Sequence, residues 1–471
     1  MPTATPEPHA DAQTTVLTVE PPLDPTAPVP SDAKRLKVPG ATALIIGGVI
    51  GTGVFTLPSS LAPYGMLAIV GLLVVTVGAI AVGLMFASLA RRIPRAGGPY
   101  AYPHEEFGDL TGFTAAWSYW LTTAVGNAGI CVSWVFYVNA MFGWDSQNVS
   151  RDLVIAMIGL WIPVGINFIG LNNVRRFQVV TVFVKVIPLI FMATVGMYFA
   201  FTKWEFPDWN PSGDMPWAVI TTTGALVLFI YLGVEDASSA AGRVENPTRN
   251  VPRATIIGTL SCAVLYVLST IAIFGLVPAG ELEATGAPFS VAMQEITGVS
   301  WSGQAIAFFA VVSGIGALNG LTLLVSEFPR AAAADGLFPK VFSRITQRDA
   351  PWVGLLVSTA LATVLVITAN LGDSGLSAFN TLILITGITS ALPYFLCALA
   401  SLRLLFKGER PHPGALARDL FVTILAAAFS VWCIFGSGLM PILWSALLIV
   451  IGYVIYGIDR VLRRRTGTLI T

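Results

Sequence analysis

The chain has 471 residues, of which 55% are hydrophobic and only 11% are charged, and its formal net charge is zero. Soluble proteins carry about 25% charged residues, so this composition excludes an ordinary soluble protein. The balanced charge gives no indication of nucleic-acid binding. We therefore expect an all-α polytopic membrane protein in a lipid bilayer.

Cysteine and histidine do not form clusters in this sequence. The four cysteines lie singly in apolar runs, and the three histidines are scattered over the tail and loops. This spacing indicates neither a disulfide framework nor a metal site. No catalytic set of His, Ser and acidic residues is evident either, so we expect no cofactor, no metal and no enzyme activity.

The chain divides into a tail, a core and a C-terminal part. Residues 1–37 are rich in Pro, Thr and Ala and predict a disordered cytoplasmic tail. Residues 38–405 form the predicted transport core of ten spans, and residues 406–471 hold two more spans and the C-terminus. The twelve apolar runs are 41–64, 67–90, 110–142, 152–171, 177–202, 216–242, 254–277, 300–327, 351–371, 375–405, 418–437 and 440–459.

The Lys and Arg residues predict the orientation. If twelve spans alternate, all but three of the 26 basic residues fall on one side, the exceptions being Arg151, Lys185 and Lys203. Basic loops stay in the cytoplasm. We therefore expect a multi-pass plasma-membrane protein with both termini cytoplasmic.

The first apolar run is interrupted by glycines. Residues 47–58 read GGVIGTGVFTLP, with four glycines among the first seven. Glycine disfavours a continuous helix, and an interrupted backbone in the membrane needs protein or a watery cavity around it. The break therefore predicts a binding site, the alternative being a close helix–helix contact.

A second interruption lies in the sixth run, five spans later. Gly233, Glu235 and Asp236 break the apolar sequence there. Paired breaks at corresponding positions predict an inverted-repeat transporter with a midplane site. The helix that follows Thr52 and Gly53 would direct free N–H groups at a carboxylate. Free carbonyls near the breaks would suit an ammonium group, so the pocket fits an amino acid.

Several ordered motifs carry a resemblance to a known family. They are GVIGTGVF (48–55), GGPYAY (97–102), YW (119–120), GN (126–127), GVE (233–235), ENPTRNVP (245–252) and AADGLFP (333–339). Together they resemble the amino acid–polyamine–organocation superfamily, most closely its basic amino acid/polyamine antiporters. The resemblance implies a five-plus-five inverted repeat with discontinuous helices 1 and 6. It also implies secondary transport of amino acids, in particular cationic amino acids or polyamines, by exchange or proton coupling. A proton-coupled neutral amino acid symporter and an amino acid exporter are the alternatives.

The resemblance also implies a set of substrate-binding residues. The backbone N–H groups of Gly51, Thr52 and Gly53 and the Thr52 hydroxyl would hold a carboxylate. The carbonyl groups of Val49, Phe229 and Leu232 would hold the ammonium group. Leu321 stands where an arginine-exchanging member of the family has a tryptophan, which argues against a guanidinium substrate. The full expected set is Val49, Ile50, Gly51, Thr52, Gly53, Tyr119, Thr122, Thr123, Asn127, Ile130, Phe229, Leu232 and Leu321.

Four residues are expected to act in gating or coupling. Phe229 and Tyr119 would close the pocket, and Glu235 would be a gate and coupling carboxylate, since ionisable groups in a membrane are usually functional. Complementing a helix dipole is the alternative for Glu235. Lys185 takes the place that a lysine occupies in several family members instead of a sodium ion, which predicts sodium-independent transport; snorkelling is its alternative. Asp236 is expected to be a local cap or a hydrogen-bonded neighbour, with its role open.

The last two spans lie outside the inverted repeat. We expect them to act as scaffold or as a homodimer contact.

Overall fold

The computed structural model describes residues 36–93, 98–144, 148–169, 184–239, 244–346, 350–370, 374–407 and 413–465. The predicted tail, up to residue 35, lies outside them. The regular elements of the described chain are helices, joined by loops, and one isolated parallel bridge pairs Leu36 with Val244. Its main helices are α1 (Val38–Val49), α2 (Gly53–Leu61), α3 (Leu67–Arg92), α4 (Ala101–Phe107), α5 (Asp109–Phe142), α6 (Val149–Ile169), α8 (Met197–Lys203), α9 (Pro216–Leu228), α10 (Asp236–Ser239), α11 (Pro247–Leu276), α12 (Ala279–Ala284), α13 (Pro288–Thr297), α14 (Ser300–Ala334), α15 (Trp352–Ala369), α16 (Gly375–Phe406), α17 (Pro413–Gly436) and α18 (Leu439–Arg465).

Proline and glycine mark several helix ends. Proline is the first residue of α9, α11 and α13, where its missing N–H costs nothing and its fixed φ suits a helix. Gly143 and Gly298 end α5 and α13 in the left-handed conformation. The helix bounds therefore follow from local sequence chemistry.

The predicted spans correspond to helices, with both interrupted spans as special cases. Among the described residues, ten helices are long and apolar enough to cross a membrane. The pair Val38–Val49 and Gly53–Tyr64, bent by 56°, forms an eleventh span. The sixth predicted span is shorter: the apolar part covers Pro216–Tyr231, and the four-residue α10 follows after a turn. The architecture is an all-α polytopic membrane bundle.

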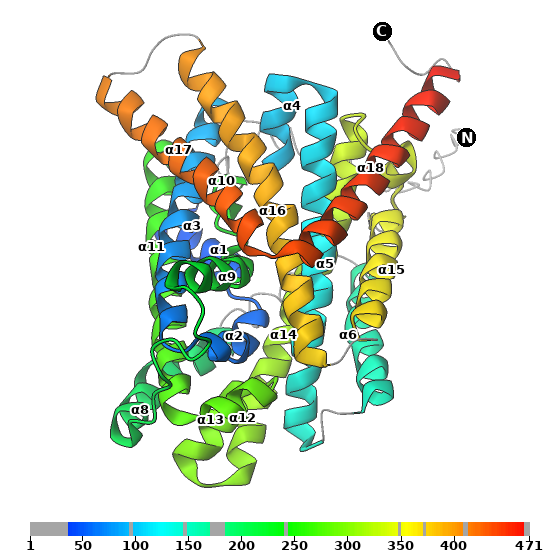
Figure 1. Cartoon of the computed structure of the whole chain (residues 1–471). Helices are drawn as coiled ribbons and strands as arrows, with labels where there is room; N and C mark the ends of the chain where they lie inside the picture. Colours follow the sequence, from blue (N-terminus) through cyan, green and yellow to red (C-terminus); the bar gives the residue numbers. More distant parts are fainter. Residues whose placement is uncertain are drawn as a thin grey trace, which may run out of the picture.

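Helix α5 lies at the centre of the bundle, and α18 lies at its edge (Figure 1). Every residue in the most apolar stretch of α5 is buried inside the protein, whereas only 11% of the residues in the corresponding stretch of α18 are buried. Helices α14 and α16 flank α5, and α1 packs on α11. Most of the exposed side chains of α18, among them Leu443, Leu447 and Val450, are apolar. A helix with this surface suits contact with lipid.

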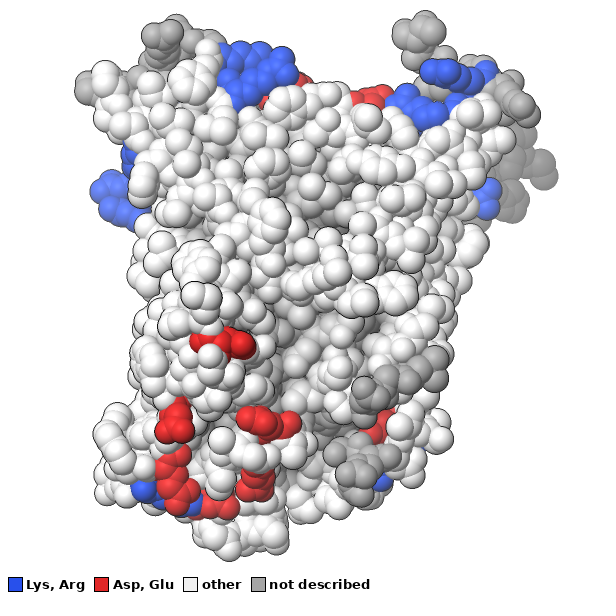
Figure 2. All heavy atoms as spheres, in the orientation of Figure 1, with Lys and Arg blue, Asp and Glu red and all other residues white. Residues whose placement is uncertain are grey.

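Charges separate to the two ends of the bundle (Figure 2). At one end, Asp419 lies within 4 Å of Arg91, Arg92 and Arg418, and Glu106 pairs with Arg403 and Lys407. We call this end the basic face. The opposite end, which we call the acidic face, carries α12 and α13 and the ion pair between Lys203 and Glu295 (Figure 1).

Helix α2 is locked to its neighbours near the acidic face. The Phe55 and Phe289 rings meet edge to face with centroids 5.1 Å apart. The Thr56 hydroxyl donates to the Gly286 carbonyl at 3.0 Å, and the Tyr137 hydroxyl donates to the Phe55 carbonyl at 2.8 Å. These contacts hold α2 against α5 and α13 and close the bundle on this side.

Candidate substrate site

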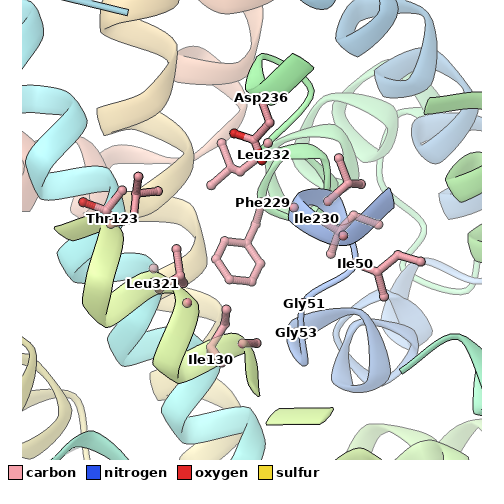
Figure 3. A pocket seen from close by; sticks show the side chains of 18 of the residues that line it. Ile50, Gly51, Gly53, Thr123, Ile130, Phe229, Ile230, Leu232, Asp236 and Leu321 are labelled. Carbon is pink, nitrogen blue, oxygen red and sulfur yellow. The ribbon is translucent and has the colours of Figure 1, made fainter. Parts of the chain in front are cut away.

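The two interrupted spans meet at a cavity of about 420 Å³ inside the bundle. Its walls come from α1, α2, α5, α14, the start of the helix Val184–Lys203, and the chain from the end of α9 to the start of α10. Figure 3 shows Thr123, Ile130 and Leu321 facing Phe229 and Leu232 across it. The cavity reaches Glu327, which is paired with Arg330 at 2.7 Å and 31% exposed. The cavity therefore extends toward the basic face.

The first break leaves backbone N–H groups without acceptors. Helix α1 ends at Val49, Ile50 takes an extended conformation, and α2 begins at Gly53. No described residue accepts a hydrogen bond from the N–H groups of Gly51, Gly53 or Val54, and all three residues line the cavity. Free N–H groups at a helix N-terminus form an anion site. The break thus has the chemistry to hold a carboxylate.

The second break presents carbonyl oxygens. A single 3-10 turn, η4 (Phe229–Tyr231), ends at Leu232 in an extended conformation, and Gly233 follows with φ +102. Glycine reaches this φ without a steric penalty. The Leu232 carbonyl has no donor among the described residues, whereas the Phe229 carbonyl accepts from the Leu232 N–H at 3.4 Å. Of the three predicted ammonium acceptors, Leu232 is the one that stays unoccupied.

Tyr266 on α11 joins the two breaks, a contact that the sequence does not predict. Its hydroxyl lies 3.1 Å from the Val49 carbonyl and 3.4 Å from that of Ile230. The Val49 carbonyl thus already accepts one hydrogen bond, and its second lone pair is left for an ammonium group. A lone tyrosine within an apolar span is the signal that could have found this contact, because a buried hydroxyl needs a partner.

Phe229 lies in a slot lined by glycines. A methyl group on Gly53 would come within 2.4 Å of its ring, and Gly126 and Gly129 also face the ring. The ring meets Phe379 edge to face, with centroids 6.4 Å apart. The Phe229 ring thus lies between α2, α5 and α16 at the wall of the cavity, a position that suits an aromatic gate.

Glu235 is surrounded by hydrogen-bond donors. The Tyr119 and Tyr394 hydroxyls both donate to its Oε1 at 2.9 Å, and the Gly233 N–H donates to Oε2 at 3.2 Å. The carboxylate therefore connects α5, α16 and the second break. The sequence predicts Tyr119 at the gate but not Tyr394, because nothing in the sequence places α16 beside Glu235.

Lys185 and Asp236 meet the first break at consecutive glycines. The Lys185 ammonium donates to the Gly47 carbonyl. The Asp236 carboxylate lies so close to Gly48 that a methyl group there would sit 2.0 Å from Oδ2. Lys185 is 5% exposed, and both side chains line the cavity. Asp236 does not cap the helix, contrary to one expectation: no described backbone N–H donates to its side chain.

The remaining predicted residues divide into cavity wall and packing behind it. Ile50, Tyr119, Thr122, Thr123, Ile130 and Leu321 line the cavity. Thr52 and Asn127 are not among the lining residues and are at most 1% exposed. Asn127 donates to Thr322 at 3.3 Å, and the Thr52 Oγ1 is buried without a partner. The expectation that the Thr52 hydroxyl faces the substrate therefore does not fit this geometry.

Comparison with known proteins agrees with this architecture. The model of the family described as "Amino acid permease" matches residues 36–466. The putrescine transporter PotE of Haemophilus influenzae is 30% identical over 425 residues, which cover 90% of this chain and 97% of that protein. PotE of Escherichia coli is 30% identical over 90% of this chain and 96% of its own length. The cadaverine/lysine antiporter of Escherichia coli is 29% identical over 78% of this chain and 82% of its own length. The chain belongs to the amino acid permease family.

Proposed function

We propose that this protein is a secondary transporter that exchanges cationic amino acids and polyamines by alternating access. The observation that carries the proposal is the cavity between the two broken spans. Unpaired N–H groups of Gly51 and Gly53 form one pole, and the Leu232 carbonyl with the acidic pair Glu235 and Asp236 forms the other. This polarity complements a carboxylate and an ammonium group.

The relatives and the cavity wall support a cationic substrate. The related proteins are named for putrescine, cadaverine and lysine, which all carry an unbranched methylene chain ending in an ammonium group. Ile130 and Leu321 give the cavity an apolar wall for such a chain. The neutral amino acid symporter remains the second candidate, because the same poles would hold any zwitterion.

Alternating access would use the contacts at the two ends. Phe55 packs on Phe289 near the acidic face, while the cavity reaches Glu327 toward the basic face. Since basic ends of membrane proteins lie in the cytoplasm, we assign the basic face to the cytoplasm and both termini with it. The protein would then be a multi-pass protein of the cell membrane in an inward-facing form.

Two further assignments belong to this proposal. The Lys185 ammonium on the Gly47 carbonyl would replace a coupling sodium ion, so transport would be sodium-independent. Helices α17 and α18, at the edge of the bundle, would supply the contact if the protein forms a homodimer.

Counterflow in proteoliposomes tests the function. Vesicles loaded with lysine, ornithine, putrescine or cadaverine should accumulate labelled lysine or putrescine from outside without any pH gradient. Empty vesicles should not. Accumulation of leucine or alanine that depends on an inward proton gradient and not on internal substrate would overturn exchange and establish symport.

A further inference from the structure

Asp236 and Glu235 are neighbours in sequence, but only one of them is held by the protein. Glu235 accepts hydrogen bonds from two tyrosine hydroxyls and a backbone N–H. The Asp236 carboxylate accepts none from any described residue, although its side chain lines the cavity (Figure 3). The backbone N–H of Asp236 is occupied, since it donates to the Gly233 carbonyl at 3.1 Å.

The ammonium group among the lining residues does not form a direct ion pair with Asp236. Lys185 donates to the Gly47 carbonyl, and no carboxylate of the described chain lies within 4.0 Å of its nitrogen. Lys185 and Asp236 interact electrostatically over a longer distance. Asp236 thus has a counter-charge nearby, but no described residue donates a hydrogen bond to its oxygens.

The place of the Asp236 carboxylate is fixed by the two breaks. Its Oδ2 lies against Gly48 and would be 3.3 Å from a methyl group on Gly233. Leu232, whose carbonyl has no donor in the described chain, lines the same part of the cavity (Figure 3). An unpaired carboxylate and an unpaired carbonyl oxygen at one end of a cavity form an acceptor pair for a cation.

The charges of the lining residues indicate which ligand fits. Glu327 is already neutralised by Arg330 at 2.7 Å. The remaining ionisable pair of carboxylates, Glu235 and Asp236, faces the one ammonium group of Lys185, so the lining has an excess of one negative charge when all three are ionised. A zwitterion leaves this excess uncompensated, whereas a ligand with one net positive charge balances it.

We infer that Asp236 is a specificity-determining residue whose carboxylate, together with the Leu232 carbonyl, receives an ammonium group of the transported cation. Glu235, by contrast, is held by the protein and acts on the gate. This inference rests on the proposed function, because it names the residue that would select cationic amino acids and diamines over neutral amino acids.

Binding to the purified protein tests the inference. The probes are lysine, 1,5-diaminopentane and norleucine, which matches lysine in shape but lacks the side-chain ammonium group. The wild type should bind lysine or diaminopentane at least tenfold more tightly than norleucine. Asp236→Asn and Asp236→Ser should each reduce that preference at least tenfold. Glu327→Gln, which removes a carboxylate already paired with Arg330, should change it less than threefold.

The outcomes separate the inference from the function. If the folded wild type binds none of the three probes, the proposed function fails. If it prefers the cations and both Asp236 variants keep that preference within threefold, the inference is overturned while the function stands. An equal loss in Glu327→Gln also overturns it, because selectivity then follows total charge rather than contact with Asp236.

If neither Asp236 variant folds, a measurement on the wild-type protein tests the inference instead. In mildly acidic buffer, where a carboxyl group is protonated often enough to react, a hydrophobic carbodiimide should modify Asp236 in the empty protein, because its side chain faces the cavity. Saturating lysine should reduce that modification at least fivefold, as read by peptide mass spectrometry. Modification of Asp236 that ignores the ligand, or its absence in the empty protein, would contradict the inference.

Discussion

Gly48 and Gly233 bring the backbones of the two broken spans into contact. A methyl group on Gly233 would lie 2.9 Å from the Gly48 carbonyl carbon, and one on Gly48 would lie 2.0 Å from the Asp236 carboxylate. No larger side chain fits between these segments without moving them. The close approach places the N–H pole of the first break beside the carbonyl and carboxylate pole of the second.

Gly233→Ala should therefore abolish transport. Alanine at φ +102 is strained by about 1–3 kcal/mol, and its methyl group would also push the two breaks apart. Gly298→Ala is the matched control, since Gly298 has φ +68 but nothing within 4 Å of an added methyl group. Exchange should fall more than tenfold in the first variant and stay near wild type in the second. Equal exchange rates in the two variants would show that contact between the breaks is unimportant.

Tyr266→Phe removes the hydroxyl shared by the Val49 and Ile230 carbonyls. Leaving buried acceptors unpaired costs about 1–3 kcal/mol, and the two breaks would lose the hydrogen-bond donor that they share. We expect a lower unfolding temperature and at least a tenfold slower exchange. Tyr198→Phe, at a side chain that is 67% exposed, should match the wild type in both. A Tyr266→Phe protein with wild-type stability and rate would remove Tyr266 from the site.

Transport should be independent of sodium because the Lys185 ammonium contacts the Gly47 carbonyl at the first break. Uptake into proteoliposomes should be equal in sodium and choline buffers. Lys185→Ala should lose most exchange, while Lys203→Ala, which breaks a surface ion pair with Glu295, should keep it. A tenfold stimulation of the wild type by sodium would contradict this role for Lys185.

The sequence predicts the spans and the two breaks because their signals are local. Apolar runs, the glycines of 47–53 and the carboxylates after Gly233 are visible in single segments. Contacts between spans are not, since Tyr266, Tyr394 and Thr322 reach the site from helices whose neighbours depend on packing. The same limit explains why Thr52 and Asn127, which were expected to bind the substrate, do not line the cavity. A position on a helix face can be predicted, but which part of that face borders the cavity is set by the surrounding helices.

The pH dependence of transport tests whether Glu235 senses protons. The groups around it are the Tyr119 hydroxyl from α5, the Tyr394 hydroxyl from α16, the Gly233 N–H, and the charges of Asp236 and Lys185. A proton on Glu235 would weaken the two tyrosine contacts, because a neutral carboxyl group is a weaker acceptor than a carboxylate. If protonation drives the gate, transport should change with pH through this residue.

Glu235→Gln should therefore flatten the pH dependence of transport while leaving folding intact, because glutamine is close to isosteric with glutamate and still accepts hydrogen bonds through its oxygen. If Glu235 only complements the helix dipole, the variant should lose about 1 kcal/mol of stability and keep the wild-type profile. Initial uptake measured from about pH 5 to 8, the range around physiological pH, separates the two. Asp236→Asn is the matched neutralisation one residue away: it should weaken cation selectivity and displace the pH profile to lower pH, because a negative charge beside Glu235 is lost, but it should not flatten the profile. Parallel profiles for the wild type and Glu235→Gln would return Glu235 to a structural role.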